Sequence, residues 1–289
     1  MPLIQNILFP VDFSPSCIAM AGYVQRAAAL FSSARVTLLH VVDLASHNGF
    51  ELYLRPTPEI SDEHYNLACE RLKSFLATEF PVATSPRILV SGDAATQIAK
   101  TARDGKFDLI VMPTHSGVFR QTLLGSTTAK VLDDADCPVL TSRHAETHAP
   151  HPIEHREWVC AIGLSRDSER VLRFATRAAG ESNAHLTLLH AVQGQDPKLP
   201  IKLHLEAELH SAEKHLAAES LQQLLQSVGS NATARIAIGS VKDALLQAAH
   251  QSRADVLIIG RRPRSGTYGR LRDLTYAMIR DSPFPVLSV

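Results

Sequence analysis

The chain has 289 residues, which is enough for two domains of ordinary size. Lysine plus arginine equals aspartate plus glutamate, at 29 each, so its charge gives no argument for a nucleic-acid partner or an anionic membrane. No apolar run approaches membrane-spanning length, and no basic segment precedes the apolar N-terminal stretch, so neither a membrane span nor a signal peptide is expected.

Short apolar runs alternate with helical patterns through the first half of the chain. The strands are predicted at residues 3–11, 35–42, 86–91, 107–112 and 138–142, and the helices at 15–31, about 58–78, 94–102 and 127–134. The strands are rich in β-branched residues and almost continuously apolar, which is typical of a parallel sheet covered on both faces. Five such strands with alternating helices predict a doubly wound α/β domain.

The second half of the chain repeats the first at a nearly fixed offset. TLLHVV from Thr37 recurs as TLLHAV from Thr187, and FDLIVM from Phe107 recurs as ADVLII from Ala254. A repeat of this length is a duplicated domain, because each half is large enough to fold alone.

A polar segment rich in histidine and proline, residues 144–156, separates the repeats, and we expect it to link domains at 1–143 and 157–289. Its histidines have spacings of four and three residues that could gather a metal ion: His144, His148, His151 and His155. A flexible linker does not preorganise a metal site, so we expect no metal there.

Asp12 is the first candidate ligand-binding residue. In a doubly wound sheet the ligand crevice lies outside the carboxyl ends of the strands, where the strand order reverses, and Asp12 follows the first strand. A carboxylate there suits the hydroxyls of a ribose or the amino edge of a base. The alternative is a helix cap, but Ser14 at the N-cap and Pro15 at the first helical position already supply that start.

The stretch PTHSGVFRQTLLGST follows the fourth strand and is the candidate phosphate loop. Gly125 has no Cβ, so a phosphate could approach the backbone closely. Ser126, Thr127 and Thr128 open a helix, which offers N–H groups, hydroxyls and the positive end of the helix dipole. The alternative is that Ser126 is only the N-cap of this helix. The placement of the loop, across the switch point from Asp12, favours the phosphate site.

These motifs together resemble the universal stress protein family in its tandem, two-domain form. ILFPVDFS resembles the family's first strand with its ligand aspartate, LLHVVD resembles the second strand, and VMPTH followed by LLGSTTAKVLDDADCPVL resembles the long signature. The resemblance implies two Rossmann-like domains of the adenine nucleotide alpha hydrolase-like type, each with a five-stranded parallel sheet.

The resemblance also implies that the N-terminal domain binds an adenine nucleotide, ATP, with Mg²⁺ on its phosphates. The base and ribose would lie near Pro10, Val11, Asp12 and Val41. The phosphates would lie near the end of the fourth strand, the loop and the next helix: Met112, Pro113, His115, Ser116, Gly117, Gly125, Ser126, Thr127 and Thr128.

The loop departs from the family's nucleotide-binding pattern of Gly, two residues, Gly, nine residues, then Gly-Ser or Gly-Thr. Pro113 stands at the first glycine and Ser116 at the second, or Gly117 if the gap is shifted, and eight residues separate Ser116 from Gly125. Pro113 removes a backbone N–H that could point at a ligand. His115 could contact phosphate or lie in solvent. We expect a weakened site.

The second half departs much further. Gly163 stands where Asp12 stands, and the pair Arg272-Asp273 replaces Gly125-Ser126. We expect an acidic side chain at the helix start to repel phosphate, so this half is expected to have lost the nucleotide site. Five arginines could hold an anion or an acidic partner, although a solvated basic loop is the favoured explanation: Arg261, Arg262, Arg264, Arg270 and Arg272.

Three functions compete. The first is a stress-response or regulatory protein that binds ATP in its N-terminal domain, the second a scaffold without nucleotide that acts through dimer and partner surfaces, and the third a slow ATP hydrolase. The sequence has no Gly-x-Ser-x-Gly elbow and no P-loop, so no catalytic residue is expected.

The last strands of the two domains, in CPVLTS and FPVLSV, are expected to pair with each other, because unpaired sheet edges invite pairing. A homodimer of chains stays open. The cysteines have no metal-like spacing and read as buried thiols in a reducing compartment, which indicates the cytoplasm: Cys17, Cys69, Cys137 and Cys160.

Overall fold

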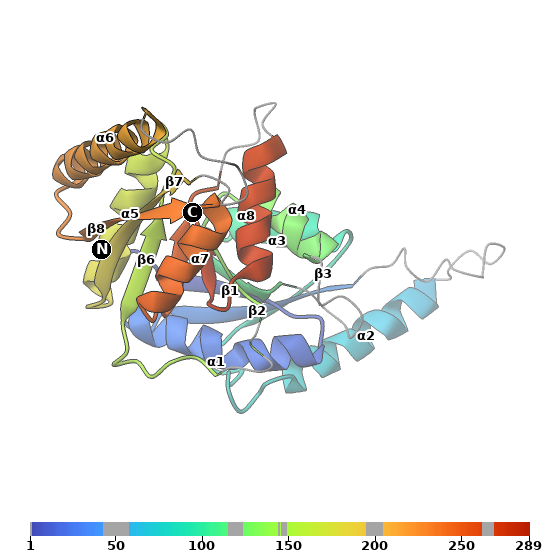
Figure 1. The fold of residues 1–289 in the computed structure, drawn as a ribbon. Helices are drawn as coiled ribbons and strands as arrows, with labels where there is room; N and C mark the ends of the chain where they lie inside the picture. Colours follow the sequence, from blue (N-terminus) through green and yellow to red (C-terminus); the bar gives the residue numbers. More distant parts are fainter. Residues whose placement is uncertain are drawn as a thin grey trace. The chain divides into compact units, whose positions relative to one another are not determined.

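The computed structural model describes residues 2–42, 58–114, 124–143, 145, 149–194, 205–261 and 269–289, with the backbone alone for 58–64, 205–211 and 269–273. The chain divides into two compact units, Met1–Pro150 and His151–Val289. Figure 1 shows strands alternating with helices in each unit. None of the helices in the described ranges is long and apolar enough to cross a membrane.

The first unit is a parallel sheet with helices between its strands. Its strands lie in the order β3-β2-β1-β4-β5, and each neighbouring pair is parallel. Its elements are β1 (Asn6–Pro10), α1 (Pro15–Leu30), β2 (Arg35–Val42), α2 (Pro58–Ser74), β3 (Arg87–Ser91), α3 (Ala94–Asp104), β4 (Leu109–Pro113), α4 (Ser126–Asp134) and β5 (Val139–Ser142).

The second unit repeats this topology, with the strand order β8-β7-β6-β9-β10 and parallel pairing throughout. Its elements are β6 (Glu157–Ala161), α5 (Ser168–Glu181), β7 (His185–Gln193), α6 (Leu205–Val228), β8 (Thr233–Gly239), α7 (Val241–Gln251), β9 (Val256–Ile259), α8 (Gly269–Asp281) and β10 (Val286–Ser288). The predicted fold class, two repeated doubly wound α/β domains, is confirmed.

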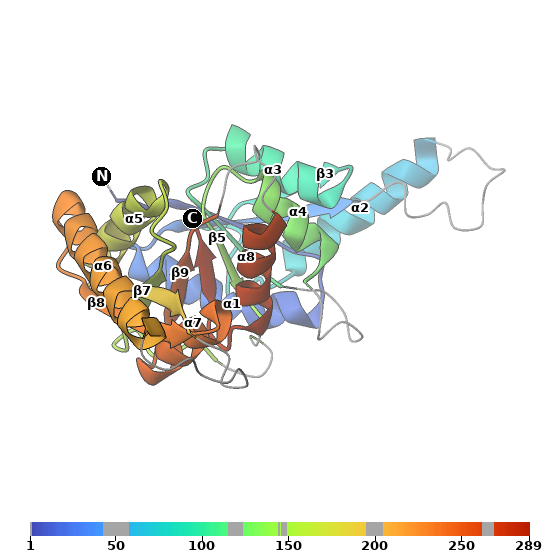
Figure 2. The ribbon, with the colours of Figure 1, turned by 45° about the horizontal axis from the view of Figure 1, so that its top comes forward.

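Helices cover both faces of the first sheet, which explains its apolar strands. Helices α1 and α2 lie on one face and α3 and α4 on the other (Figure 1), and α3 packs beside α4 (Figure 2). The consecutive β1 residues Ile7, Leu8 and Phe9 are all 0% exposed, although their side chains point to alternate faces. Burial on both faces is therefore what the continuous apolar pattern encoded.

The start of α1 forms as its sequence predicts. Ser14 is the N-cap and its Oγ accepts a hydrogen bond from the backbone N–H of Cys17 at 3.3 Å, and Pro15 is the first helical residue. Proline suits that position because the first N–H groups of a helix have no partner within the helix. Helix α1 therefore begins a short loop after β1, and its fixed start limits where the loop 11–14 can lie.

Candidate functional site

The strand order of the first unit reverses between β1 and β4. β2 follows β1 on one side, whereas β4 pairs with the other side of β1 through Ile7↔Leu109 and Leu8↔Ile110. Because these strands are parallel, their carboxyl ends meet at one edge of the sheet. The predicted residues of the described chain that lie along or just after these strand ends are Pro10, Val11, Asp12, Val41, Met112 and Pro113.

Asp12 lies exposed in the loop after β1 and has a structural task as well. Its Oδ1 accepts a hydrogen bond from the backbone N–H of Ser14 and another from the Cys17 thiol, both at 3.0 Å. Ser14 caps α1 as expected, but Asp12 has a structural role of another kind, because it holds the loop before the helix. The spacing Asp-x-Ser was the available signal, because aspartate side chains commonly accept from the N–H two residues on.

The Cys17 thiol is a donor in this loop rather than a nucleophile. Burial, and next the charge of Asp12, raise the pKa of the Cys17 thiol to about 12. The thiol therefore stays protonated at neutral pH and donates to Asp12. Cys17 and Asp12 form a hydrogen-bonded pair at the carboxyl ends of the strands, so a substitution of either residue affects the other.

The loop after β1 is also held by an aromatic cluster that the sequence did not reveal. The ring of Phe13 lies 4.2 Å from that of His40 and 5.1 Å from that of Phe75, centroid to centroid, and the Arg71 guanidinium lies 4.4 Å from the Phe13 centroid. Phe13 has φ +62°, a conformation that a bulky residue rarely adopts without surrounding packing. Helix α2 thus helps to place the loop that carries Asp12.

His40 joins the ends of β1 and β2. Its Nδ1 donates to the carbonyl oxygen of Val11 at 2.7 Å, and burial lowers the pKa of the imidazole. The second unit has the same bond, from His190 Nδ1 to the carbonyl of Ile162 at 2.9 Å. Both histidines therefore have the same structural role, which is to tie the end of one strand to the residue that follows its neighbour.

Helix α4 begins one residue earlier than predicted and is capped by a residue without a side chain. Gly125 is the N-cap, and its N–H donates to the carbonyl of Thr114 at 2.9 Å. Ser126 is exposed and is the first helical residue, so the alternative that Ser126 is the N-cap is wrong. The backbone N–H groups of Ser126, Thr127 and Thr128 belong to the first turn, where a helix offers N–H donors and positive potential.

The side chain of Thr128 has a different task. Its hydroxyl is buried and donates to the carbonyl of Pro113 at 3.1 Å, which fastens the first turn of α4 to the end of β4. Thr128 therefore offers a ligand its backbone and not its hydroxyl. The remaining predicted residues, His115, Ser116 and Gly117, lie outside the described residues.

The second unit has the same strand end without the carboxylate. The N–H of Val11 donates to Leu39 O at 2.8 Å and that of Ile162 to Leu189 O at 3.0 Å, so Gly163 occupies the position of Asp12. A Cβ built at Gly163 meets no atom within 4 Å. Packing therefore does not require glycine at this position. Compared with Asp12 in the first unit, Gly163 lacks only the carboxylate.

The start of α8 corrects one prediction about the second unit. Helices α4 and α8 end at equivalent residues, Asp134 and Asp281, but α8 begins at Gly269 and is 13 residues long against 9 for α4. Arg272-Asp273 therefore lies inside the helix and not at its start, because α8 has about one further turn at its N-terminus.

Only part of the predicted arginine cluster is described. Arg261 is half-buried, and its backbone N–H donates to Val289 O at 2.6 Å. Arg262 and Arg264 lie outside the described residues, and Arg270 and Arg272 are described by their backbone alone. The favoured explanation, a solvated basic loop, therefore stays a prediction, with an anion site as the alternative.

The sequence model of the universal stress protein family matches residues 3–143 and again 156–289. The chain belongs to the universal stress protein family. Among curated relatives, Universal stress protein MJ0577 of Methanocaldococcus jannaschii is 28% identical over 151 residues, which span 47% of this chain and 93% of that protein. The Na(+)/H(+) antiporter NhaS5 of Synechocystis sp. is 32% identical over 117 residues, which span 40% of this chain and 16% of the antiporter.

Solved universal stress proteins share the fold over the whole chain. The crystal structure of such a protein from Archaeoglobus fulgidus superposes with a TM-score of 0.69 and covers 99% of this chain and 97% of that one, at 21% identity. The tandem universal stress protein architecture expected from the sequence is therefore confirmed.

Proposed function

We propose that this universal stress protein is a stress-response or regulatory protein that binds an adenine nucleotide, ATP with Mg²⁺, in its N-terminal unit. One observation carries the proposal: parallel pairing of β1 and β4 brings the exposed carboxylate of Asp12 and the start of α4 to the same edge of the sheet, at the switch point. Open α/β sheets bind ligands in this crevice.

The chemistry of this edge suits a nucleotide. Asp12 would accept hydrogen bonds from ribose hydroxyls or a base amino group, with Pro10, Val11 and Val41 beside the base. The N–H groups at the start of α4 would donate to phosphate, because the N-terminus of a helix attracts anions. Gly125 leaves room for a phosphate against the backbone. Met112, Pro113, His115, Ser116 and Gly117 complete the proposed site, and Mg²⁺ would be held mainly by the phosphates.

Two observations favour the competing scaffold function. Asp12 Oδ1 already accepts hydrogen bonds from Ser14 and Cys17, so a ligand that binds this oxygen has to share it with these donors or displace them. The Thr128 hydroxyl is likewise engaged by Pro113. A family member that acts only through partner surfaces would keep these internal contacts and bind no nucleotide.

Calorimetry and thermal unfolding of the full chain with ATP and Mg²⁺ separate the two functions. We expect one site per chain, and a gain in unfolding free energy of about 2.7 kcal/mol at a hundredfold excess over the dissociation constant. Asp12→Asn keeps an acceptor for Ser14 but removes the charge, and Gly125→Glu puts a carboxylate against the phosphates. Both variants should weaken binding at least tenfold.

The matched control is Gly163→Ala, which changes the equivalent position of the second unit where a Cβ has open space. It should leave ATP binding unchanged. Folded wild-type chain that neither binds nor is stabilised by any adenine nucleotide would favour the scaffold, and two equal ATP sites per chain would refute a site confined to the first unit.

We further propose that the two units pair through β5 and β10 and that the protein works in the cytoplasm. None of the four cysteines forms a disulfide in the structure, and disulfides are rare in the cytoplasm. β5 pairs with β4 and β10 pairs with β9, so each is the last strand of its own unit, where the edge of a sheet invites pairing with another strand.

A further inference from the structure

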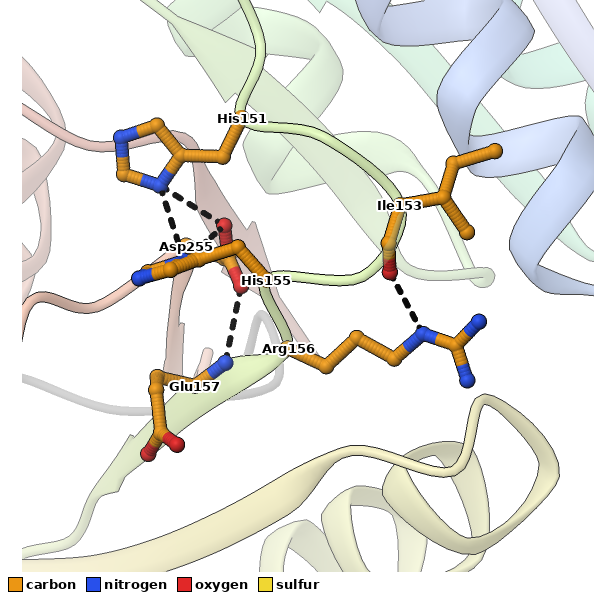
Figure 3. A network of polar contacts seen from close by, with 6 residues as sticks. All are labelled: His151, Ile153, His155, Arg156, Glu157 and Asp255. Carbon is orange, nitrogen blue, oxygen red and sulfur yellow. Dashed lines mark hydrogen bonds and ion pairs between the residues drawn. The ribbon is translucent and has the colours of Figure 1, made fainter.

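Two histidines and a buried aspartate meet at the start of the second unit (Figure 3). His151 Nδ1 lies 2.8 Å and His155 Nδ1 lies 2.9 Å from the same oxygen, Oδ1 of Asp255, and the two Nδ1 atoms are 3.2 Å apart. Within the described residues this is a group of three ligand-type side chains whose donor atoms all lie within 4.8 Å of one another. No feature of the proposed nucleotide site accounts for it.

The carboxylate is held in place by the sheet. Asp255 directly precedes β9, its side chain is 2% exposed, and its Oδ2 accepts the backbone N–H of Glu157 at 2.8 Å, at the start of β6. β6 and β9 are neighbouring parallel strands. Asp255 therefore cannot swing away from the histidines without breaking a bond at the edge of the sheet.

The histidines are placed by a turn that is tied to the second unit. The His155 N–H donates to Pro152 O at 3.0 Å, and the Arg156 side chain donates to Ile153 O at 2.6 Å and to Ser182 O at 2.7 Å. The expectation of no metal assumed a flexible linker, whereas the second compact unit begins at His151. These contacts supply the preorganisation that a flexible segment would lack.

The internal repeat shows which part of this arrangement the fold itself requires. Asp108 is the counterpart of Asp255, and its Oδ2 accepts the backbone N–H groups of Gln5 and Asn6, both at 2.9 Å, at the start of β1. One carboxylate oxygen therefore fastens the strand start in both units. The two imidazoles on the other oxygen are an addition of the second unit, so strand geometry does not explain them.

The three donor atoms match one face of a tetrahedral metal site. Zinc–ligand bonds of about 2.0–2.1 Å place neighbouring tetrahedral ligands roughly 3.3 Å apart, so the atoms here need move by only about 0.5 Å. Two imidazole nitrogens and one carboxylate oxygen suit Zn²⁺ and its first-row neighbours. The bond from Glu157 N to Oδ2 is an outer contact of the kind that orients a ligating carboxylate.

We propose that His151 Nδ1, His155 Nδ1 and Asp255 Oδ1 bind a divalent first-row transition-metal ion, of which Zn²⁺ is the representative. The side chains of His151 and His155 are 47% and 32% exposed, so water can complete the coordination from the solvent side. Each bound imidazole carries its proton on Nε2, and that nitrogen of His151 points away from Asp255 (Figure 3). The ion fastens the first residues of the second unit to the start of β9.

This site is independent of the proposed nucleotide site. It belongs to the second unit, and it lies where β9 begins, at the amino ends of the strands, whereas the nucleotide crevice is at carboxyl ends in the first unit. Metal binding can therefore be measured without ATP, and either proposal can fail alone.

The test is a Zn²⁺ titration of chelator-treated full-length protein by calorimetry, with visible absorption of Co²⁺-loaded protein as a readout of coordination. The variants are His151→Ala, His155→Ala and the double variant. His185→Gln is the matched control, because His185 pairs with Glu157 at 3.2 Å in the same unit but outside the group. Asp255→Asn is not relied on, since it also alters the strand start.

We expect the wild-type chain and His185→Gln to bind one Zn²⁺ more per chain than the double variant. The Zn²⁺ that the double variant still binds measures the background binding by the other histidines. Each single variant should bind this ion at least tenfold more weakly, because even the loss of an outer-shell partner costs 10–100-fold. Zn²⁺ should raise the melting temperature of the wild type and not that of the double variant. Equal Zn²⁺ binding by the wild type and the double variant would overturn the proposal and leave the imidazoles as hydrogen-bond donors to Asp255.

Discussion

His40 fixes the loop after β1 as a neutral side chain. Burial is the main reason that the pKa of the imidazole lies below its ordinary value of 6.5, with Arg71 acting in the same direction and Asp12 and the Val11 carbonyl opposing it. The folded state therefore resists protonation more than the unfolded chain does. The contribution of neutral His40 to the free energy of unfolding is therefore complete above the pKa that His40 has in the unfolded chain. It is lost as the pH falls below about 6.5.

The residue-scale prediction concerns this pH window. His40→Gln keeps an N–H donor but cannot titrate, so the variant should lose less unfolding free energy than the wild type between about pH 7.5 and about pH 5. Urea denaturation at a series of pH values measures the difference, and the window stays above the range where carboxylates dominate. Parallel curves for the two proteins would show that His40 does not titrate differently on folding.

Among the helix starts whose N-caps the structure describes, those of α3 and α5 both carry aspartate but use it differently. Asp93 at the start of α3 accepts the N–H of Thr96 at 2.9 Å and pairs with Lys130 of α4 at 2.8 Å. Asp167 at the start of α5 has αR backbone angles and makes no side-chain cap bond. Sequence alone does not distinguish the two, because both residues are good capping types.

The element-scale prediction follows from this contrast. Asp93→Ala should lower the free energy of unfolding by about 1 kcal/mol, through the lost cap and, to a smaller degree, the exposed ion pair. Asp167→Ala should change it by less than about 0.5 kcal/mol. Urea unfolding followed by circular dichroism measures both variants, and equal losses would contradict the assigned caps.

The whole molecule is a duplicated scaffold whose two units have diverged at opposite edges of their sheets. The first unit keeps Asp12 at the carboxyl ends of its strands, where the second has Gly163. The second unit adds His151 and His155 to the aspartate at the amino ends, where the first has only Asp108. Each proposed ligand therefore belongs to one unit, and the duplication allows two different sites on one chain.

The prediction at this scale tests the pairing of the last strands. If β5 and β10 pair with each other, the backbone amides along both strands should all be protected from hydrogen exchange, including those that face away from β4 and β9. Exchange measured by mass spectrometry or NMR on the full chain provides the test. Rapid exchange of the alternate, outward-facing amides in both strands would show two free edges.

The sequence by itself determined the repeat, the parallel strands and the cap of α1, because apolar periodicity and the Ser14-Pro15 signal are local properties of the chain. It also predicted that Asp12 and the start of α4 lie at the carboxyl ends of the strands, since alternating strands and helices indicate a doubly wound sheet. Only the tertiary structure decided that Asp12 binds the Cys17 thiol, that α8 begins a turn early, and that Asp255 meets two histidines about a hundred residues away. These contacts depend on how the chain folds back on itself, and no local pattern of residue types encodes the distance between side chains so far apart in sequence.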